Sequence, residues 1–128
     1  MSVKRTKVDS AKIPGLVNYT VELIREKKGY HIMIINLDKL TTFTDFLIIC
    51  TVDSSRQGQT ISDHILGSLK DQKMKPLNIE GYNQAKWILM DYIDFIVNIF
   101  DRETREFYQL ERIWRDAPVK VIKDEEDR

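Results

Sequence analysis

The sequence has little of what several large classes of protein require. Its one cysteine, Cys50, rules out an internal disulfide framework and most thiolate metal sites. No segment approaches the roughly 20 consecutive apolar residues that a membrane-spanning helix needs. Lysine plus arginine number 20, as do aspartate plus glutamate, so no overall positive charge attracts nucleic-acid phosphates. We therefore expect a soluble protein of a reducing, cytoplasmic setting, with no direct nucleic-acid binding beyond incidental contacts.

What is present favours one folded unit. The 128 residues are 42% hydrophobic and 31% charged, enough for a single core with a solvated surface. Residues 1–12 carry Lys4, Arg5, Lys7 and Lys12 but no apolar run of signal-peptide length, so we expect a flexible basic segment there. Residues 119–128 end in a run of charged side chains and are expected to form a tail. The predicted domain is residues 13–118.

Hydrophobic periodicity predicts both helices and strands. Helices are expected from Ile13 to the basic turn before Gly29, from the start signal at Ser54 to Lys73, and from Asp101 past Trp114. In the third helix, Phe107, Leu110 and Trp114 share one face. Strands are expected at residues 31–37, 45–52, 85–90 and 95–100, with a very short one at 77–79.

The order of these segments indicates a mixed sheet with helices packed on it, an α/β fold. Residues 85–90 and 95–100 are separated by four residues, which predicts an antiparallel hairpin. The connection through Ser54 leads from a strand into a helix and implies one right-handed crossover.

Several residues are candidates for chemistry, but each has a simpler structural role. Asp45 is a lone carboxylate at the head of a strand, whereas nucleotidyl transfer needs paired carboxylates and a phosphate cradle. Arg56 lies in a turn without glycine, unlike phosphate-binding loops. His31 and His64 lack metal-ligand spacing and a nucleophile partner. We therefore predict no catalytic residue, metal or cofactor.

The C-terminal third interleaves aromatic and acidic side chains. The set comprises Trp87, Tyr92, Tyr108 and Trp114 together with Glu80, Asp91, Asp94, Glu106 and Glu111. Aromatic rings supply desolvated area and carboxylates supply complementarity, so the set suits a protein interface for a basic partner. Equally, both tryptophans could be core residues and the acids ordinary surface. Composition does not decide between these two interpretations.

Several separated motifs resemble the Iojap or ribosome silencing factor family. They are the runs 44–51 (TDFLIICT), 54–56 (SSR) and 62–64 (SDH), then Glu80-Gly81, Trp87, the turn 91–94, Phe100 before Asp101, and Phe107-Tyr108-x-Leu110-Glu111-x-x-Trp114. The likeness covers residues 13–118. It implies a nucleotidyltransferase-like fold without a catalytic site, in a factor that represses translation when nutrients are short.

The resemblance also implies a partner and a mode of action. The partner is the large ribosomal subunit, through its fourteenth protein, and the effect is steric exclusion of the small subunit. A homodimer is also expected, because the family commonly dimerises. By resemblance, the contact residues are Glu80, Trp87, Asp91, Asp94, Tyr108 and Glu111.

The chain departs from the family pattern at four positions. Val52 and Ile93 stand where relatives usually have glycine, and Gln57 and Asn98 stand where they often have histidine. A β-branched residue is poorly suited to positive φ, so Ile93 predicts another turn type or a longer loop. That change bears on how Asp91 and Asp94 are oriented.

Two other functions remain open from the sequence. One is a minimal metal-dependent nucleotidyltransferase or phosphate-ester hydrolase that uses Asp45, His64, Asp91 and Asp94. The other is a homodimeric scaffold unrelated to ribosomes. Metal-dependent stabilisation would indicate the enzyme, and partner binding without ribosome association would indicate the scaffold.

Overall fold

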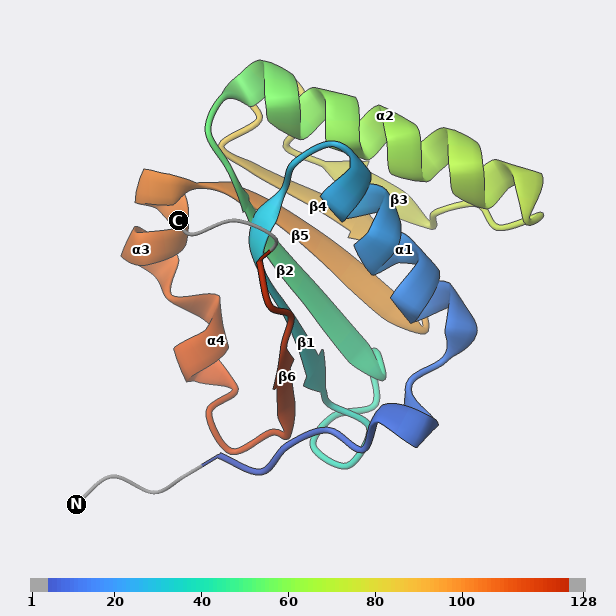
Figure 1. Ribbon diagram of the computed structural model, residues 1–128, viewed down its shortest axis with the longest axis vertical. Helices are drawn as coiled ribbons and strands as arrows, with labels where there is room; N and C mark the ends of the chain where they lie inside the picture. Colours follow the sequence, from blue (N-terminus) through green and yellow to red (C-terminus); the bar gives the residue numbers. More distant parts are fainter. Residues whose placement is uncertain (1–4, 125–128) are drawn as a thin grey trace.

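The computed structural model describes residues 5–124 and shows a six-stranded mixed sheet flanked by helices (Figure 1). The elements are η1 (Ser10–Lys12), α1 (Gly15–Glu26), β1 (Tyr30–Asn36), β2 (Phe46–Val52), α2 (Ser55–Asp71), β3 (Asn78–Glu80), β4 (Trp87–Asp91), β5 (Phe95–Asp101), α3 (Arg102–Tyr108), α4 (Leu110–Ile113) and β6 (Val119–Val121). The strand order is β3-β4-β5-β2-β1-β6. Strands β2 and β5 run parallel, and the other neighbours are antiparallel. The expected α/β class is confirmed.

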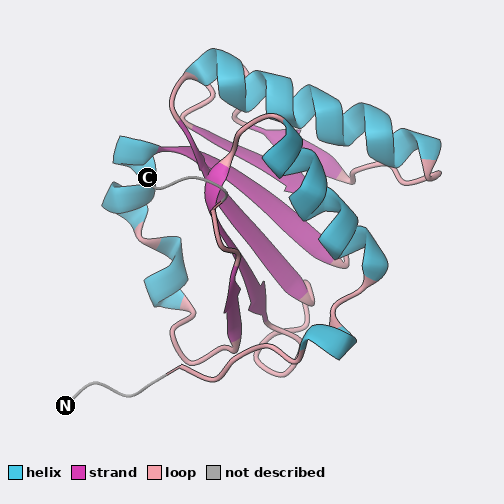
Figure 2. Cartoon of the chain, in the orientation of Figure 1, coloured by secondary structure: helices cyan, strands magenta, loops and turns pink. Residues whose placement is uncertain are grey.

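Helices α1 and α2 cover one face of the sheet (Figure 2). Each helix is amphipathic, because apolar side chains recur at helical spacing and point inward. Val17, Val21 and Ile24 of α1 are buried, as are Ile61 and Ile65 of α2. Every residue of β2 is buried, as predicted for a strand covered on both faces. Across residues 5–124, we find no helix with the length and apolarity needed to cross a membrane.

The second face of the sheet has a smaller core, to which the C-terminal helices contribute. Helix α3 packs against β5 and β2. Leu110 and Trp114 pack on a cluster that includes Phe100. The single third helix expected from the sequence is wrong, because α3 ends at Tyr108 and Gln109 adopts φ +46 before α4 begins. This turn separates Leu110 and Trp114 from Phe107, which is 78% exposed instead of packed.

The folded unit extends past both boundaries expected from the sequence. Residues 119–121 form β6, which pairs with β1 rather than forming a tail. Residues 5–12 pack on the domain: Val8 is buried and donates its backbone N–H to the Val119 carbonyl. Pairing with a neighbouring strand satisfies the backbone groups of these short segments, a benefit that local composition does not reveal. Residues 1–4 and 125–128, at the outer ends of the expected basic segment and tail, lie outside the described residues.

The hairpin between β4 and β5 keeps a tight turn. Tyr92 donates its backbone N–H to the Phe95 carbonyl, and Asp94 donates to Tyr92, at 2.9 Å each. Ile93 adopts φ +73 between the Tyr92 carbonyl and the Asp94 N–H, which is the hydrogen-bond pattern of a γ-turn. The turn is therefore of another type, as one of the two expected alternatives had it, and the expected longer loop is wrong. The Asp91 carboxylate accepts the Ile93 backbone N–H at 2.8 Å, which helps hold that conformation.

Candidate partner surface

The second face of β3 and β4 is the part of the sheet that the helices leave partly exposed. Side chains alternate along a strand, so Trp87, Leu89 and Asp91 share one face of β4, while Ile88 and Met90 are buried on the other. On β3, Glu80 pairs with Leu89 and therefore points to the same side. We call Glu80, Trp87, Leu89 and Asp91 the β4 face.

Trp87 is the largest side chain of the β4 face and is held from three directions. Its ring centroid lies 4.8 Å from that of Phe100 and 5.0 Å from that of Tyr108. Its indole Nε1 donates to Oδ1 of Asn98 at 2.9 Å. The ring is half-buried, so Trp87 is neither a pure core residue nor a free surface side chain. Trp87 therefore combines features of a core residue with features of an interface residue.

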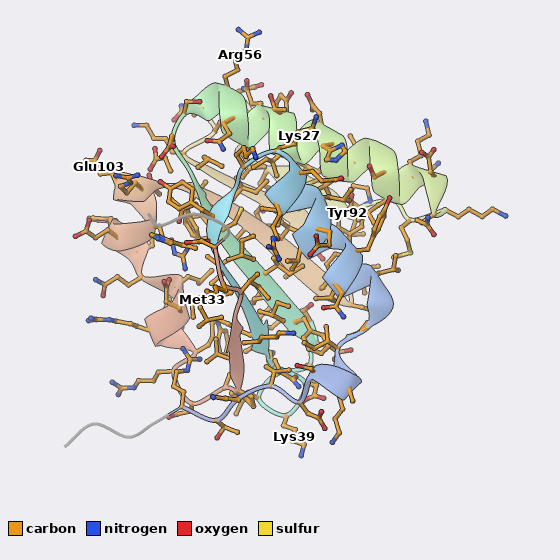
Figure 3. All side chains as sticks on the ribbon, viewed as in Figure 1. Lys27, Met33, Lys39, Arg56, Tyr92 and Glu103 are labelled. Atoms are coloured by element: carbon orange, nitrogen blue, oxygen red, sulfur yellow. The ribbon has the colours of Figure 1, made fainter. Side chains whose placement is uncertain are left out.

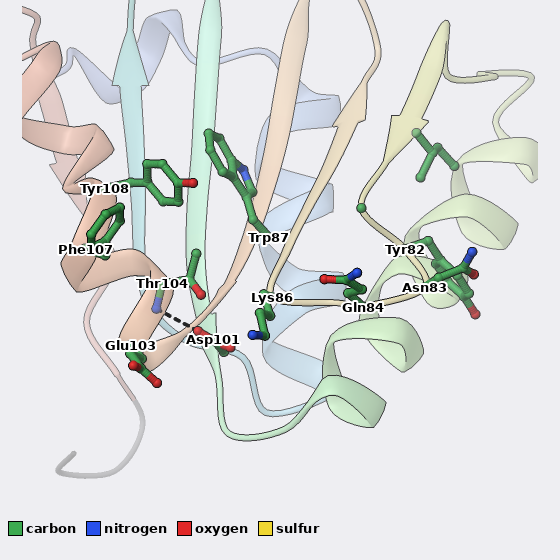
Figure 4. Close-up of a pocket in the computed structure, with 12 residues that line it drawn as sticks. Tyr82, Asn83, Gln84, Lys86, Trp87, Asp101, Glu103, Thr104, Phe107 and Tyr108 are labelled. Atoms are coloured by element: carbon green, nitrogen blue, oxygen red, sulfur yellow. Dashed lines mark hydrogen bonds between the residues drawn. The ribbon is translucent and has the colours of Figure 1, made fainter.

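A groove of about 730 Å³ opens beside Trp87, between the β3–β4 loop and α3 (Figure 4). Trp87, Phe107 and Tyr108 supply its aromatic side, and Figure 4 shows their rings grouped together. Asp101 and Glu103 lie on the α3 side and Lys86 on the loop side. The groove thus combines aromatic area with charges of both signs, as protein interfaces do.

The loop wall of the groove is fixed to α2. Gln59 donates its side-chain amide to the backbone carbonyls of Tyr82 at 2.9 Å and Asn83 at 3.3 Å. The Tyr82 hydroxyl donates to Asp63, a bond that raises the pKa of the phenol. Gly81 has φ +79, and a Cβ there would lie 2.0 Å from the Trp87 carbonyl oxygen. Glycine is therefore required where this loop crosses the start of β4.

The α3 wall is anchored at its N-terminus. Asp101 caps α3 by accepting the Thr104 backbone N–H at 2.7 Å, as predicted from the sequence. Arg102 donates to the Tyr30 hydroxyl at 2.6 Å and to Asp53 at 3.1 Å. Burial raises the pKa of Tyr30, and its bond to the Asp53 carboxylate acts in the same direction. These bonds fix α3 to the ends of β1 and β2, and hence fix Tyr108 beside Trp87.

Four of the six expected contact residues lie on or beside the β4 face. Glu80, Trp87 and Asp91 belong to it, and the Tyr108 ring packs against Trp87 at a tilt. Asp94 is exposed in the hairpin at the end of the sheet.

Glu111 is placed differently from the other five. Its Oε2 accepts from Arg105 Nε at 3.1 Å, and Oε1 is buried without a hydrogen-bond partner within residues 5–124. Its carboxylate therefore serves the anchoring of α3 and α4.

The residues of the alternative enzyme do not converge. His64 faces Glu26 of α1 at 3.2 Å, on the helix-covered side of the sheet, whereas Asp91 lies on the β4 face. Asp45 and Asp94 meet through their backbones at the strand ends, with an N–H to carbonyl distance of 3.1 Å. In the described part of the chain, no three His, Cys, Asp or Glu side chains are grouped as metal ligands. Arg56 projects from the start of α2 away from the rest of the protein (Figure 3).

Sequence reasoning missed three residues of this surface. Leu89 could have been found, because it lies two residues from Trp87 on a strand and so shares its face. Phe107 was expected on one helix face with Leu110 and Trp114, and the break at Gln109 separates it from them. Asn98 was noted as a departure from the family pattern, but nothing in the sequence indicated its bond to Trp87.

The fold and this surface together define a class: an α/β fold with an aromatic, partly acidic face on one end of its sheet. A family model described as "Ribosomal silencing factor during starvation" matches residues 10–128. A ribosomal silencing factor from Haemophilus influenzae is 36% identical over 78% of this chain and 98% of its own length. Another, from Halalkalibacterium halodurans, is 32% identical over 81% of this chain and 89% of its own length. The chain belongs to the ribosomal silencing factor family.

The likeness extends to structure and to an organellar relative. A crystal structure of a protein from Bacillus halodurans has a TM-score of 0.74 and 29% identity, and the match covers 84% of this chain and 97% of that one. A mouse protein named "Mitochondrial assembly of ribosomal large subunit protein 1" is 25% identical over 77% of this chain and 44% of its own length. The resemblance found from the sequence motifs is therefore confirmed at the level of family and fold.

Proposed function

We propose that this protein silences ribosomes by binding the large subunit through that subunit's fourteenth protein, so that the small subunit cannot join. Membership of the silencing factor family supports a role on the ribosome, and the mouse relative's name connects that protein with the large subunit. The proposal places the protein in the cytoplasm, where it represses translation under nutrient limitation. It acts as a binding factor and not as an enzyme.

The observation that carries the proposal is the β4 face together with the neighbouring groove, which meet at Trp87. Interface energy concentrates in a few aromatic or arginine side chains that are surrounded by contacts excluding water. Trp87 is already half-buried and held by Phe100 and Tyr108, so little further ordering is needed when a partner covers it.

The charges around Trp87 favour a basic partner. Glu80 and Asp91 are the two acidic members of the β4 face, and Asp94 is exposed at the end of the same hairpin. Ribosomal proteins that bind rRNA phosphates are rich in lysine and arginine, so carboxylates here complement such a surface. Lys86 is the opposing charge in the neighbouring groove.

Blocking the small subunit requires no catalytic turnover. It requires only an interface of adequate area in a position that the small subunit would otherwise occupy. A stable interface buries roughly 800 Å² on each partner. The β4 face and the neighbouring groove adjoin at Trp87, and the proposal places the interface across both. A homodimer through the same face would compete with the subunit, so dimerisation and silencing would oppose each other.

The test is sedimentation of purified large subunits with the wild type, with Trp87→Ala and with Tyr19→Ala. Tyr19 is a matched control, because it is an aromatic residue, 37% exposed, on α1 at the other face of the sheet. Losing a central aromatic contact costs about 2 kcal/mol or more, a loss of roughly 30-fold or more in affinity. We expect wild type and Tyr19→Ala to comigrate with large subunits and Trp87→Ala to remain near the top.

Two outcomes would contradict the proposal. If the wild type does not comigrate with large subunits, the ribosomal partner is wrong. If Trp87→Ala, shown to be folded by circular dichroism, binds as well as Tyr19→Ala, the β4 face is not the binding surface. A dimer band for the free protein that disappears with subunit binding would show the expected competition.

A further inference from the structure

Asn98 is a buried polar residue in the middle of β5. It pairs with Ile49 of β2 on one side and Leu89 of β4 on the other, and its side chain is 1% exposed. Its chain neighbours Val97 and Ile99 belong to the core under α1 and α2, so Asn98 itself points to the second face. An amide buried in apolar surroundings is unfavourable unless it is hydrogen-bonded, so its partners matter.

The main partner of the Asn98 amide is the indole of Trp87. Oδ1 accepts from Trp87 Nε1 at 2.9 Å, an ideal length for such a bond. The amide nitrogen reaches the carbonyls of Ile48 and Ile96 at 3.4 and 3.5 Å, which are long for hydrogen bonds. The short contact is therefore the one to Trp87, and it crosses from β5 to β4.

This bond determines what Trp87 can offer to a partner. The indole has a single hydrogen-bond donor, and Asn98 occupies it. Phe100 and Tyr108 lie against the ring, at centroid distances of 4.8 and 5.0 Å. The remaining exposed part of the ring is apolar carbon. A partner thus meets a ring in one fixed orientation.

We propose that Asn98 is a positioning residue of the partner surface: by accepting the indole N–H, it holds Trp87 in the orientation that the partner binds. The inference rests on the proposed function, since Trp87 is the centre of the surface assigned there. The bond between Asn98 and Trp87 also indicates which kind of contact the partner makes with the ring. The partner covers Trp87 with aliphatic carbon or with the flat face of a guanidinium group, not with a hydrogen-bond acceptor.

Four variants test the inference. Asn98→Leu keeps the volume of the side chain and removes the acceptor, and Asn98→His restores a ring nitrogen that can accept from the indole. Trp87→Phe keeps an aromatic ring and removes the donor. The double variant Trp87→Phe with Asn98→Leu completes a double-mutant cycle, which isolates the coupling between the two residues. Asn98→Ser, too short to reach the indole, replaces Asn98→Leu if leucine prevents folding.

The readouts are large-subunit affinity and the indole signals of the free protein. The chain has two tryptophans, so a nitrogen-15 spectrum gives two indole signals. We expect the Trp87 N–H to exchange slowly with solvent in the wild type and in Asn98→His, and rapidly in Asn98→Leu. Affinity should fall about tenfold in Asn98→Leu, recover in Asn98→His, and not fall further when Asn98→Leu is added to Trp87→Phe.

The results that overturn the inference differ from those that overturn the proposed function. Full binding by Asn98→Leu overturns the positioning role while leaving the ribosomal partner intact. An equal loss from Asn98→Leu in the wild-type and Trp87→Phe backgrounds also overturns it, because the effect would not pass through the indole. Absence of binding by the wild type itself contradicts the proposed function instead.

Discussion

At the scale of single residues, Ile93 is the most strained position in the hairpin that carries Asp91 and Asp94. It adopts φ +73, which costs a non-glycine residue about 1–2 kcal/mol, and its side chain is 57% exposed, so little burial offsets that cost. Glycine removes the strain but loses about 0.5–1 kcal/mol through its more flexible unfolded chain. We therefore predict that Ile93→Gly raises the free energy of unfolding by about 0.5–1 kcal/mol in urea titrations.

The matched control for this prediction is Ile93→Ala. Alanine loses the same exposed side chain but keeps the Cβ that makes positive φ unfavourable. If Ile93→Gly raises the free energy of unfolding and Ile93→Ala does not, the increase comes from relief of backbone strain. A lower urea midpoint for Ile93→Gly would show that Ile93 is not strained in this turn.

Two buried weakly acidic groups, the Cys50 thiol and the Tyr92 hydroxyl, predict how the stability of the protein changes at high pH. Burial raises the pKa of the Cys50 thiol from 9.0 to about 12 and that of the Tyr92 hydroxyl from 10.0 to about 12. Both groups are neutral in the folded protein at a pH where the unfolded chain has already lost the proton. Their contribution to the free energy of unfolding is fully present below pH 9 and is lost as the pH rises towards 12. The stability of the folded protein therefore falls between these two pH values.

The measurement is the free energy of unfolding of the wild type and of Tyr92→Phe at several pH values between 8 and the alkaline limit. The Tyr92 hydroxyl has no hydrogen-bond partner among the described residues, so its removal should leave the neutral-pH stability equal or higher. We expect a shallower decline above pH 10 for the variant. Parallel curves would refute the assignment of Tyr92.

Individual residues differ in how far the sequence could foretell their roles. Composition left Trp87 undecided between core and interface, and the structure shows it half-buried against Phe100 and Tyr108. The role of Asn98 was not predictable, because a polar residue within a strand gives no sign of which side chain on the neighbouring strand it will meet. Glu111 was misleading, since its bond to Arg105 depends on the turn at Gln109.

At the scale of elements, Arg5 fastens the N-terminal segment to the end of α4. Its guanidinium donates to the carbonyls of Glu111 at 3.1 Å, Trp114 at 2.6 Å and Ala117 at 3.0 Å. Glu111 lies within α4, Trp114 is the C-cap of that helix, and Ala117 lies just beyond it. Carbonyls at the C-terminal end of a helix attract a cation. The contact explains why residues 5–12 are part of the folded unit.

We predict that Arg5→Ala destabilises the protein by about 2 kcal/mol and speeds amide exchange in α4 and β6, because it removes three part-buried hydrogen bonds to backbone carbonyls. Lys7→Ala is the control. Its side chain is exposed, and the pairing of residue 7 with Val119 is made by the backbone, so it should change stability by less than about 0.5 kcal/mol. If Arg5→Ala left the hydrogen exchange of the Val119 amide unchanged, that result would contradict this role of Arg5.

Helices and long strands were predictable because their hydrophobic periods are long enough to recognise. Strand β2 and helix α2 lie within a residue or two of their expected bounds. Strand β6 was missed because three residues beside Pro118 carry almost no pattern and form a strand only by pairing with β1. The break between α3 and α4 was missed because glutamine gives no signal for positive φ.

At the scale of the whole molecule, the two faces of the sheet have different roles. The face under α1 and α2 holds the larger core and gives a rigid support. The other face is covered at β1, β2 and β5 and remains partly exposed at β3 and β4, next to the groove at α3. A rigid body with one such surface fits a factor that works by occupying a position.

The measurement that tests this account most directly is subunit joining, followed by light scattering after purified large and small subunits are mixed. Large subunits preincubated with the wild type or Tyr19→Ala should fail to form complete ribosomes, whereas those preincubated with Trp87→Ala should join at the uninhibited rate. Normal joining in the presence of wild-type protein that is bound to the large subunit would contradict occlusion as the mechanism.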